Sequence, residues 1–278
     1  MMRSILAGAG ALAALTSGAF AADLPSRLAP PVYAPPLLPA FTWTGGYFGV
    51  NAGYAFDSDT RVTTVDGAGD ANGVATGFRP GSIKASADGF TGGGQIGYNL
   101  QVPGFGGGFG GPGSGIVIGV EADAAYTDLS RGTAVSLNGA TSSFRTGLDY
   151  LGTVRGRFGY AFNQFMVYGT GGFAYGGVND RANFYSGGNG ALEYAGHTDD
   201  MATGYAYGGG VEYALPTSSL LNFFKSSAVT IKAEYLHYDL GKTDVATTAT
   251  GANAATGTYT VRFKNEGDLA RAGLNYKF

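Results

Sequence analysis

The chain has 278 residues, including 50 glycines, 18 tyrosines, 18 phenylalanines and no cysteine, and its formal net charge is −3. The lack of cysteine excludes disulfide scaffolds, thiolate metal sites and cysteine nucleophiles. The small net charge argues against nucleic-acid binding and polybasic membrane contacts. Charged residues make up 13% of the chain, about half the share of a soluble domain, and a packed soluble core does not explain so much glycine.

Residues 1–21 are predicted to be a secretory signal peptide. Arg3 supplies the basic start, residues 5–15 form a short apolar run, and Ala19 and Ala21 fit a small-residue cleavage site. The apolar run is shorter than the ~20 residues that a membrane-spanning helix needs. We therefore expect the mature chain to begin near residue 22, outside the cytoplasm.

Residues 22–42 follow as a proline-rich segment, which contains six of the ten prolines of the chain. Proline favours an extended, polyproline-like backbone and cannot donate to a sheet ladder. We interpret this segment as a periplasmic tether, and a peptide ligand for a partner is the alternative.

Residues 43–278 repeat one pattern, in which about ten residues alternate between apolar and polar and a connection follows. The prolines of this region fall between the alternating stretches, where strand pairing permits them. The pattern predicts an all-β fold, an eight-stranded antiparallel transmembrane up-and-down β-barrel. The predicted strands are 47–56, 90–100, 116–126, 148–160, 166–176, 203–215, 229–240 and 269–278.

The connections alternate in length. Four are predicted to be long surface loops, and they cover residues 57–88, 127–143, 178–202 and 241–258. The other three are shorter, at 102–115, 161–165 and 216–228. Long external loops and shorter periplasmic turns are typical of bacterial outer-membrane barrels.

The charged residues of the predicted strands share one face. Arg155 and Arg157, for example, alternate with Val154 and Phe158. In a secreted soluble barrel, which is the alternative, the charged face would meet water. Here the charged face also carries many glycines, which suit a crowded lumen, so we expect lipid outside and polar side chains inside. The aromatic residues expected in the interfacial girdles are Trp43, Tyr47, Tyr54, Phe56, Phe90 and Tyr126.

The inward charges are the candidate functional site. Acids and bases inside a lumen of low dielectric have to form pairs, and an eight-stranded barrel is only wide enough for side chains. We therefore predict an ionic plug, with a narrow conducting path as the alternative, and no catalysis. The predicted lumen network consists of Glu121, Asp123, Asp149, Arg155, Arg157, Glu212, Lys232, Glu234 and Arg271.

The remaining motifs are weak. The glycines of residues 106–111 match a dinucleotide-binding pattern but lack its strand and helix context. His197 and His237 have no partner at metal-ligand spacing, so no metal or cofactor is predicted, although heme contact through His197 is an alternative. The aspartates of the first long loop are mixed with arginine and lysine, which favours a solvated loop over a calcium site.

An ordered set of stretches resembles the alphaproteobacterial outer-membrane β-barrel family. The stretches are "WTGGYFGVNAGYAF", "GFTGGGQIGYNLQ", "GVEADAAYTDL", "YLGTVRGRFGYAF", "VYGTGGFAYG", "GGGVEYAL", "IKAEYLHYDLG" and "RAGLNYKF". Members of this family are often called porin family proteins, and they are related to surface antigens and heme-binding proteins. The resemblance implies an eight-stranded, OmpA-like barrel. The connections 102–115 and 216–228 are longer here than is usual in the family.

The resemblance also implies an assembly signal at the end of the chain. Phe278, with Tyr276 before it, would be read by the outer-membrane insertion machinery, after escort by periplasmic chaperones. The expected location is therefore the cell outer membrane, with its lipids as partners.

We expect a structural or surface role for this barrel. Passive transport of small solutes is one alternative. The other is a surface adhesin or a heme- or ligand-binding protein that contacts host ligands through loops 57–88 and 178–202.

Overall fold

The computed structural model describes residues 41–278, apart from 57–60, 70, 86, 105–112, 217, 218, 220 and 251–255. The predicted signal peptide, with Ala19 and Ala21, lies outside the described residues, as do nearly all of the proline-rich segment and residues 106–111. No helix in the described part of the chain is long and apolar enough to cross a membrane.

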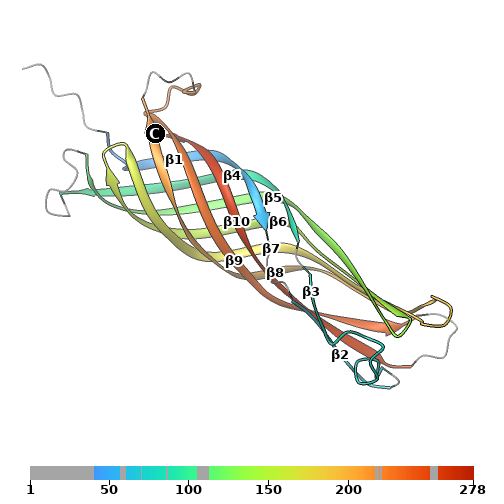
Figure 1. Ribbon diagram of the computed structural model, residues 1–278. Helices are drawn as coiled ribbons and strands as arrows, with labels where there is room; N and C mark the ends of the chain where they lie inside the picture. The colour runs from blue at the N-terminus through green and yellow to red at the C-terminus, as the bar shows by residue number, and fades with distance from the viewer. Residues whose placement is uncertain are drawn as a thin grey trace, which may run out of the picture. The chain divides into compact units, whose positions relative to one another are not determined.

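The described residues form ten strands in one antiparallel sheet (Figure 1). They are β1 (Gly45–Phe56), β2 (Arg61–Val65), β3 (Ser82–Lys84), β4 (Asp88–Pro103), β5 (Gly115–Leu137), β6 (Ala140–Phe162), β7 (Phe165–Tyr185), β8 (Leu192–Leu215), β9 (Ala228–Ala249) and β10 (Thr258–Lys277).

Eight of these strands close into a ring. Its order is β1-β4-β5-β6-β7-β8-β9-β10, and β10 pairs back onto β1 from Tyr47 opposite Lys277 to Phe56 opposite Asp268. A closed ring leaves no free edge, so backbone groups inside a bilayer find partners within the protein. The prediction of an eight-stranded antiparallel barrel is confirmed.

The outer surface of the ring carries an apolar belt. Val50, Ile96 and Val120 point outward and are 61%, 64% and 62% exposed. Each lies in the middle of a paired strand, where a neighbouring strand also presents an apolar or small residue, such as Leu274 opposite Val50. An apolar surface that continues from strand to strand in this way favours contact with lipid over contact with water.

The strands continue well beyond this belt. Strands β5 to β10 are between 20 and 24 residues long, about twice the 9–11 residues that cross a bilayer. Figure 1 shows them running together past the end of β1. We call this part the extension, and it comprises residues 129–137, 140–148, 178–185, 192–203, 240–249 and 258–266 together with β2 and β3.

The prediction of long loops is therefore wrong for most of 127–143, 178–202 and 241–258. The first of these is a continuous hairpin that turns at Asn138 and Gly139, with φ angles of 48° and 84°. Two successive positive φ angles define a type I′ hairpin turn. Outside the membrane the outer face of a strand meets water, so the alternation of apolar and polar residues becomes weaker although pairing continues.

The predicted loop 57–88 also contains structure. β2 pairs with β10, with Val62 opposite Phe263, and β3 pairs with β2. Arg79, between these strands, is buried and donates to the carbonyl oxygens of Thr141 and Tyr185 at 3.1 and 2.9 Å. Its Nη2 also lies 2.8 Å from Oε2 of Glu193. This segment therefore packs into the far end of the extension.

The described residues form three apolar clusters inside the barrel, and β6 contributes to each of them in turn. Ala161 belongs to the first, Leu151 and Leu148 to the second and Phe144 to the third. The polar residues Thr153, Arg155 and Arg157 lie between the first and the second on the same strand. A polar layer therefore crosses the lumen between two apolar layers.

Two predicted girdle residues are inside the barrel instead. Trp43 is 1% exposed, and its Nε1 donates to the carbonyl oxygen of Asn163 at 2.8 Å. Tyr47 is buried in the lumen because it alternates with the outward Phe48. Trp43 belongs to the first apolar cluster, together with Val117 and Met166, and closes the end of the barrel at which β6 turns into β7.

Candidate functional site

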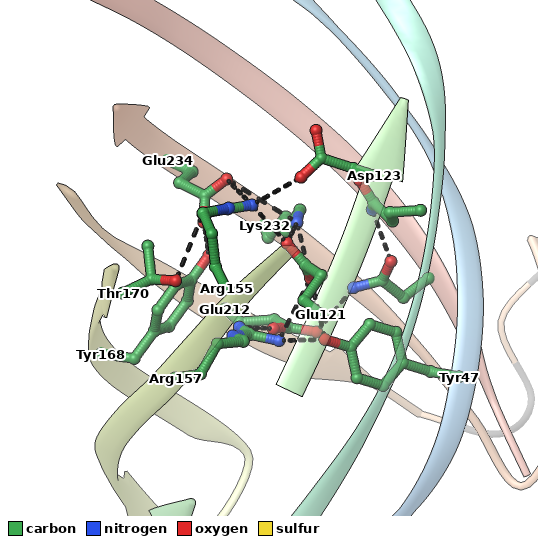
Figure 2. A network of polar contacts seen from close by, with 12 residues as sticks. Tyr47, Glu121, Asp123, Arg155, Arg157, Tyr168, Thr170, Glu212, Lys232 and Glu234 are labelled. Atoms are coloured by element: carbon green, nitrogen blue, oxygen red, sulfur yellow. Dashed lines mark hydrogen bonds and ion pairs between the residues drawn. The ribbon is translucent and has the colours of Figure 1, made fainter. Parts of the chain in front are cut away.

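Eight of the nine predicted lumen residues meet in the polar layer, and Figure 2 labels all of these except Arg271. Side chains alternate between the faces of a strand, so residues two apart on β5, β6 and β9 enter the lumen together. We call this set the lumen cluster. It consists of Glu121 and Asp123 on β5, Arg155 and Arg157 on β6, Glu212 on β8, Lys232 and Glu234 on β9, and Arg271 on β10.

Arg155 lies at the centre of the lumen cluster. Its guanidinium contacts Oε1 of Glu121 at 2.7 Å, Oδ2 of Asp123 at 2.9 Å and Oε1 of Glu234 at 3.1 Å. Its Nε donates to Oγ1 of Thr153 at 2.7 Å. One cation therefore connects acids from two different strands on opposite sides of the lumen.

Arg157 forms a second centre, nearer the end of the barrel that Trp43 closes. Nη2 donates to Oε2 of Glu212 at 2.7 Å, and Nη1 donates to the hydroxyl of Tyr47 at 2.7 Å. The guanidinium carbon lies 3.9 Å from the ring centroid of Tyr168. The Tyr47 hydroxyl in turn donates to Oε2 of Glu121 at 2.8 Å, which joins the two centres.

The remaining bases complete the pairing. Nζ of Lys232 donates to both carboxylate oxygens of Glu121, at 2.9 and 3.0 Å. Arg271 reaches Oδ1 of Asp123 at 2.9 Å and Oε2 of Glu234 at 2.7 Å. The lumen cluster thus contains four acids and four bases, and its formal charges cancel.

Asp149 is the exception, and its predicted place in the lumen is wrong. The register shifts between Leu148 and Tyr150, so Asp149 is an extra residue against β7. A bulge of this kind reverses which face the following side chains use. Asp149 is consequently exposed, and it accepts a hydrogen bond from Asn179 instead of meeting the lumen cluster.

Neutral polar residues that the prediction did not include surround the lumen cluster. Thr230 and Asn275 both donate to Oε1 of Glu212, the latter at 2.9 Å. Gln95 donates to Asn275 at 2.6 Å, and Asn51 donates to Gln95 at 2.7 Å. These neutral residues alternate onto the same strand face as the charged residues, and that position was the signal that could have identified them. The prediction missed them because it selected only ionic residues from that face.

The arrangement closes the lumen at this level. Side chains of Glu121, Arg155, Lys232 and Glu234 have no exposed surface, and each carboxylate contacts at least one cation. Buried acids and bases that are paired in this way stabilise one another, and they present no charged group to solvent.

The two histidines lie elsewhere. His197 is exposed on β8 opposite Arg181, and Nδ1 of His237 lies 2.9 Å from Oδ1 of Asp268. Among the described residues, no three His, Asp or Glu side chains are grouped so as to hold a metal ion.

A separate buried acid lies in the extension. Asp180 accepts a hydrogen bond from Oγ1 of Thr146 at 2.8 Å, and its Oδ2 has no hydrogen-bond partner among the described residues. Burial raises the pKa of its carboxyl group from 3.8 to about 6. The folded state therefore binds a proton more tightly than the unfolded chain does.

Replacing Asp180 with asparagine is expected to stabilise the protein at neutral pH. The raised pKa means that the wild-type protein loses stability as the pH rises from about 4 to about 6. Asp180→Asn should increase the free energy of unfolding by about 1–3 kcal/mol at pH 7.5, and the difference should disappear near pH 4. Urea unfolding at both pH values measures it, with the exposed Asp199→Asn as control. Equal stability of Asp180→Asn and wild type at pH 7.5 would contradict this expectation.

The closed ring, the apolar belt and the ionic lumen define a transmembrane β-barrel of the outer-membrane type. No family model matches the chain. It is 32% identical to the 31 kDa outer-membrane immunogenic protein of Brucella melitensis over 278 residues, which cover all of both chains. The chain belongs to the family of that protein, and it is an outer-membrane protein.

Other proteins are more distantly similar. The 22 kDa outer membrane protein of Rhizobium leguminosarum is 31% identical over 157 residues, which cover 54% of this chain and 60% of the relative. The crystal structure of the outer membrane protein OprG from Pseudomonas aeruginosa is 16% identical. That comparison covers 84% of this chain and 97% of the OprG chain, with a TM-score of 0.39.

Proposed function

We propose that the protein is a non-conducting, non-enzymatic structural barrel that displays the extension at the cell surface. The observation that carries this proposal is the lumen cluster, in which four acids and four bases neutralise one another and no side chain has more than 3% of its surface exposed. The apolar clusters around Trp43 and around Leu151 lie on either side of it. An ion that entered the lumen would have to break buried ion pairs, which is strongly unfavourable.

Planar-bilayer conductance of the folded protein tests this proposal. A shift in gel mobility on heating first establishes that the sample is folded. We expect no steady channels, whereas a 16-stranded porin, which encloses an aqueous channel, should conduct under the same conditions. Reproducible single-channel steps from the folded protein would contradict the proposal and support passive transport of small solutes.

We also propose that Phe278, with Tyr276, is the assembly signal read by the insertion machinery. Supporting this, the Phe278 ring is exposed and stacks on Phe48 with centroids 5.5 Å apart, and its N–H donates to the carbonyl oxygen of Gly46 at 2.9 Å. The terminal residue therefore lies at the seam between β10 and β1, where the ring closes.

Deletion of Phe278 is expected to lower the amount of folded protein in the outer membrane several-fold. The deletion removes the terminal aromatic ring and the hydrogen bond to Gly46, whereas the paired register of β10 on β1 ends at Lys277 and is kept. Heat-modifiable protein in membrane fractions measures the effect, and Phe278→Tyr, which keeps the aromatic ring, is the control. Unchanged amounts after the deletion would contradict the assignment.

A further inference from the structure

The connection between β8 and β9 ends in a hydrogen-bonded turn, residues 221–227, which lies next to the C-terminus (Figure 1). We call it the β8–β9 turn. The side chain of Asn222 fixes its shape, because it donates to the carbonyl oxygen of Ser226 at 3.0 Å and accepts from the N–H of Ser226 at 2.9 Å. The N–H and the hydroxyl of Ser227 both donate to the carbonyl oxygen of Lys277, at 2.9 and 2.8 Å. The turn is therefore held against the end of β10.

The β8–β9 turn covers a pair of outward residues at this end of the barrel. Tyr276 on β10 is opposite Val229 on β9, and each follows or precedes a residue that faces the lumen, yet they are only 7% and 0% exposed. The Tyr276 hydroxyl donates to the carbonyl oxygen of Leu221 at 3.0 Å, and the ring of Phe224 meets the ring of Tyr276 edge-on with centroids 4.8 Å apart. Ile231, the next outward residue on β9, is exposed. The turn therefore takes the place of lipid over this pair.

Apolar side chains of the turn also face away from the protein. Phe223 and Phe224 are 74% and 60% exposed, and Leu221 is exposed as well. Phe224 contacts Phe48 of β1, with ring centroids 5.7 Å apart, and Phe48 stacks on Phe278 at 5.5 Å. An exposed apolar patch of this kind marks an interaction surface. Because Phe48 belongs to the outward face of β1, the patch is continuous with the apolar belt.

The length of β1 indicates what the patch adds to the belt. The outward residues of β1 run from Phe48 to Phe56, and Phe56 is opposite Asp268, where the apolar face ends. The eight steps between them, on a strand tilted by about 40°, rise roughly 20 Å. The apolar band of an outer-membrane barrel is about 25 Å tall, so the belt along β1 is roughly 5 Å too short at the Phe48 end. The β8–β9 turn lies at that end, and its exposed rings supply the missing apolar depth.

We propose that the β8–β9 turn is a membrane anchor that inserts Leu221, Phe223 and Phe224 into the boundary between lipid headgroups and acyl chains. Phenylalanine and leucine beside a basic residue are typical of segments that lie in this boundary. The exposed Lys225 directly follows Phe224, and lysine extends its charge to water and headgroups while apolar neighbours stay buried. The occupant of the patch is the lipid of one leaflet, and the anchor fixes the depth of the seam between β1 and β10.

Tryptophan fluorescence in vesicles of brominated phosphatidylcholine tests this proposal, because bromine quenches only indole rings that it contacts. The wild-type protein gives the background, since its single tryptophan, Trp43, is buried inside the barrel. We expect the emission added by Phe223→Trp to fall at least twofold when the bromine lies near the headgroup end of the acyl chain, and to fall less when it lies near the methyl end. The heat-modifiable gel shift should be unchanged.

Phe78→Trp is the matched control for Phe223→Trp. Phe78 is also an exposed phenylalanine, but it lies between β2 and β3, in the segment that packs into the far end of the extension. We expect no quenching of Phe78→Trp by either lipid. If Phe223→Trp does not fold, Leu221→Trp repeats the measurement on the same turn, with the same quenching expected.

Equal emission from the turn in brominated and ordinary vesicles would overturn the proposal, because the turn would then not touch lipid. If that emission also lay at the short wavelength of a shielded indole, a protein surface would cover the patch instead. Chemical cross-linking of the folded barrel would then show whether this surface is a second copy. Quenching of Phe78→Trp as strong as that of Phe223→Trp would also overturn the anchor, because contact with lipid would not be specific to the β8–β9 turn.

Discussion

Replacing Arg155 with methionine is expected to lower the free energy of unfolding by about 3–5 kcal/mol. Arg155 contacts Glu121, Asp123 and Glu234 at distances of 2.7 to 3.1 Å, and none of these side chains has more than 2% of its surface exposed. Methionine fills a similar volume but leaves an excess negative charge inside the barrel. Urea unfolding in lipid vesicles, followed by the heat-modifiable gel shift, measures the change.

Arg145→Met is the matched control for Arg155→Met. It makes the same substitution on the same strand, but Arg145 is exposed on the extension. A surface change of this kind usually alters stability by less than about 0.5 kcal/mol. If the two variants differ by less than about 1 kcal/mol, the lumen cluster does not have the role in stability that its pairing indicates.

Val50→Arg is expected to cost about 2–4 kcal/mol, because it places a charge on the lipid face near the middle of the membrane. Val50 is paired on both sides, with Gly94 on β4 and Leu274 on β10, inside the apolar belt. The matched control is Val65→Arg, since Val65 is 49% exposed on β2 in the extension.

Unfolding in vesicles compares the two arginine variants. Val65→Arg should remain within about 0.5 kcal/mol of wild type, because its side chain reaches water. If both variants lose the same free energy of unfolding, depth in the membrane does not determine the effect. The position assigned to the apolar belt would then be wrong.

The sequence predicted the ring and the direction of its side chains because both depend on period-two alternation. Arg155 and Arg157 face the lumen while Val154 and Phe158 face outward, as the pattern indicated. Asp149 did not follow this rule, because the bulge between Leu148 and Tyr150 reverses the faces. A bulge depends on pairing with a neighbouring strand, so alternation along one strand cannot locate it.

The extension could be predicted only in part. In strands with water on one side, alternation is blurred by threonine, serine and glycine, and residues 127–143 therefore read as a loop. The Asn138–Gly139 pair was a usable signal, because this dipeptide favours a two-residue hairpin turn. The pairing of β2 with β10 had no such signal, since it joins residues about 200 positions apart, as in Val62 opposite Phe263.

The partners of the charges could not be predicted either. Composition supplied five acids and four bases, and the structure balances them by excluding Asp149. Tyr47 belongs with Arg157 and Glu121, but an aromatic residue near a strand end resembles a girdle residue in the sequence. Which polar side chains meet across the lumen depends on the tilt and stagger of the strands.

The continuous sheet of the extension also determines how an antibody can recognise this protein. Arg145, Arg181 and His197 lie side by side on β6, β7 and β8, although the chain separates them widely. An epitope on this surface is therefore discontinuous, and its side chains come together only in the folded barrel. Synthetic peptides that copy single segments should therefore bind such antibodies poorly.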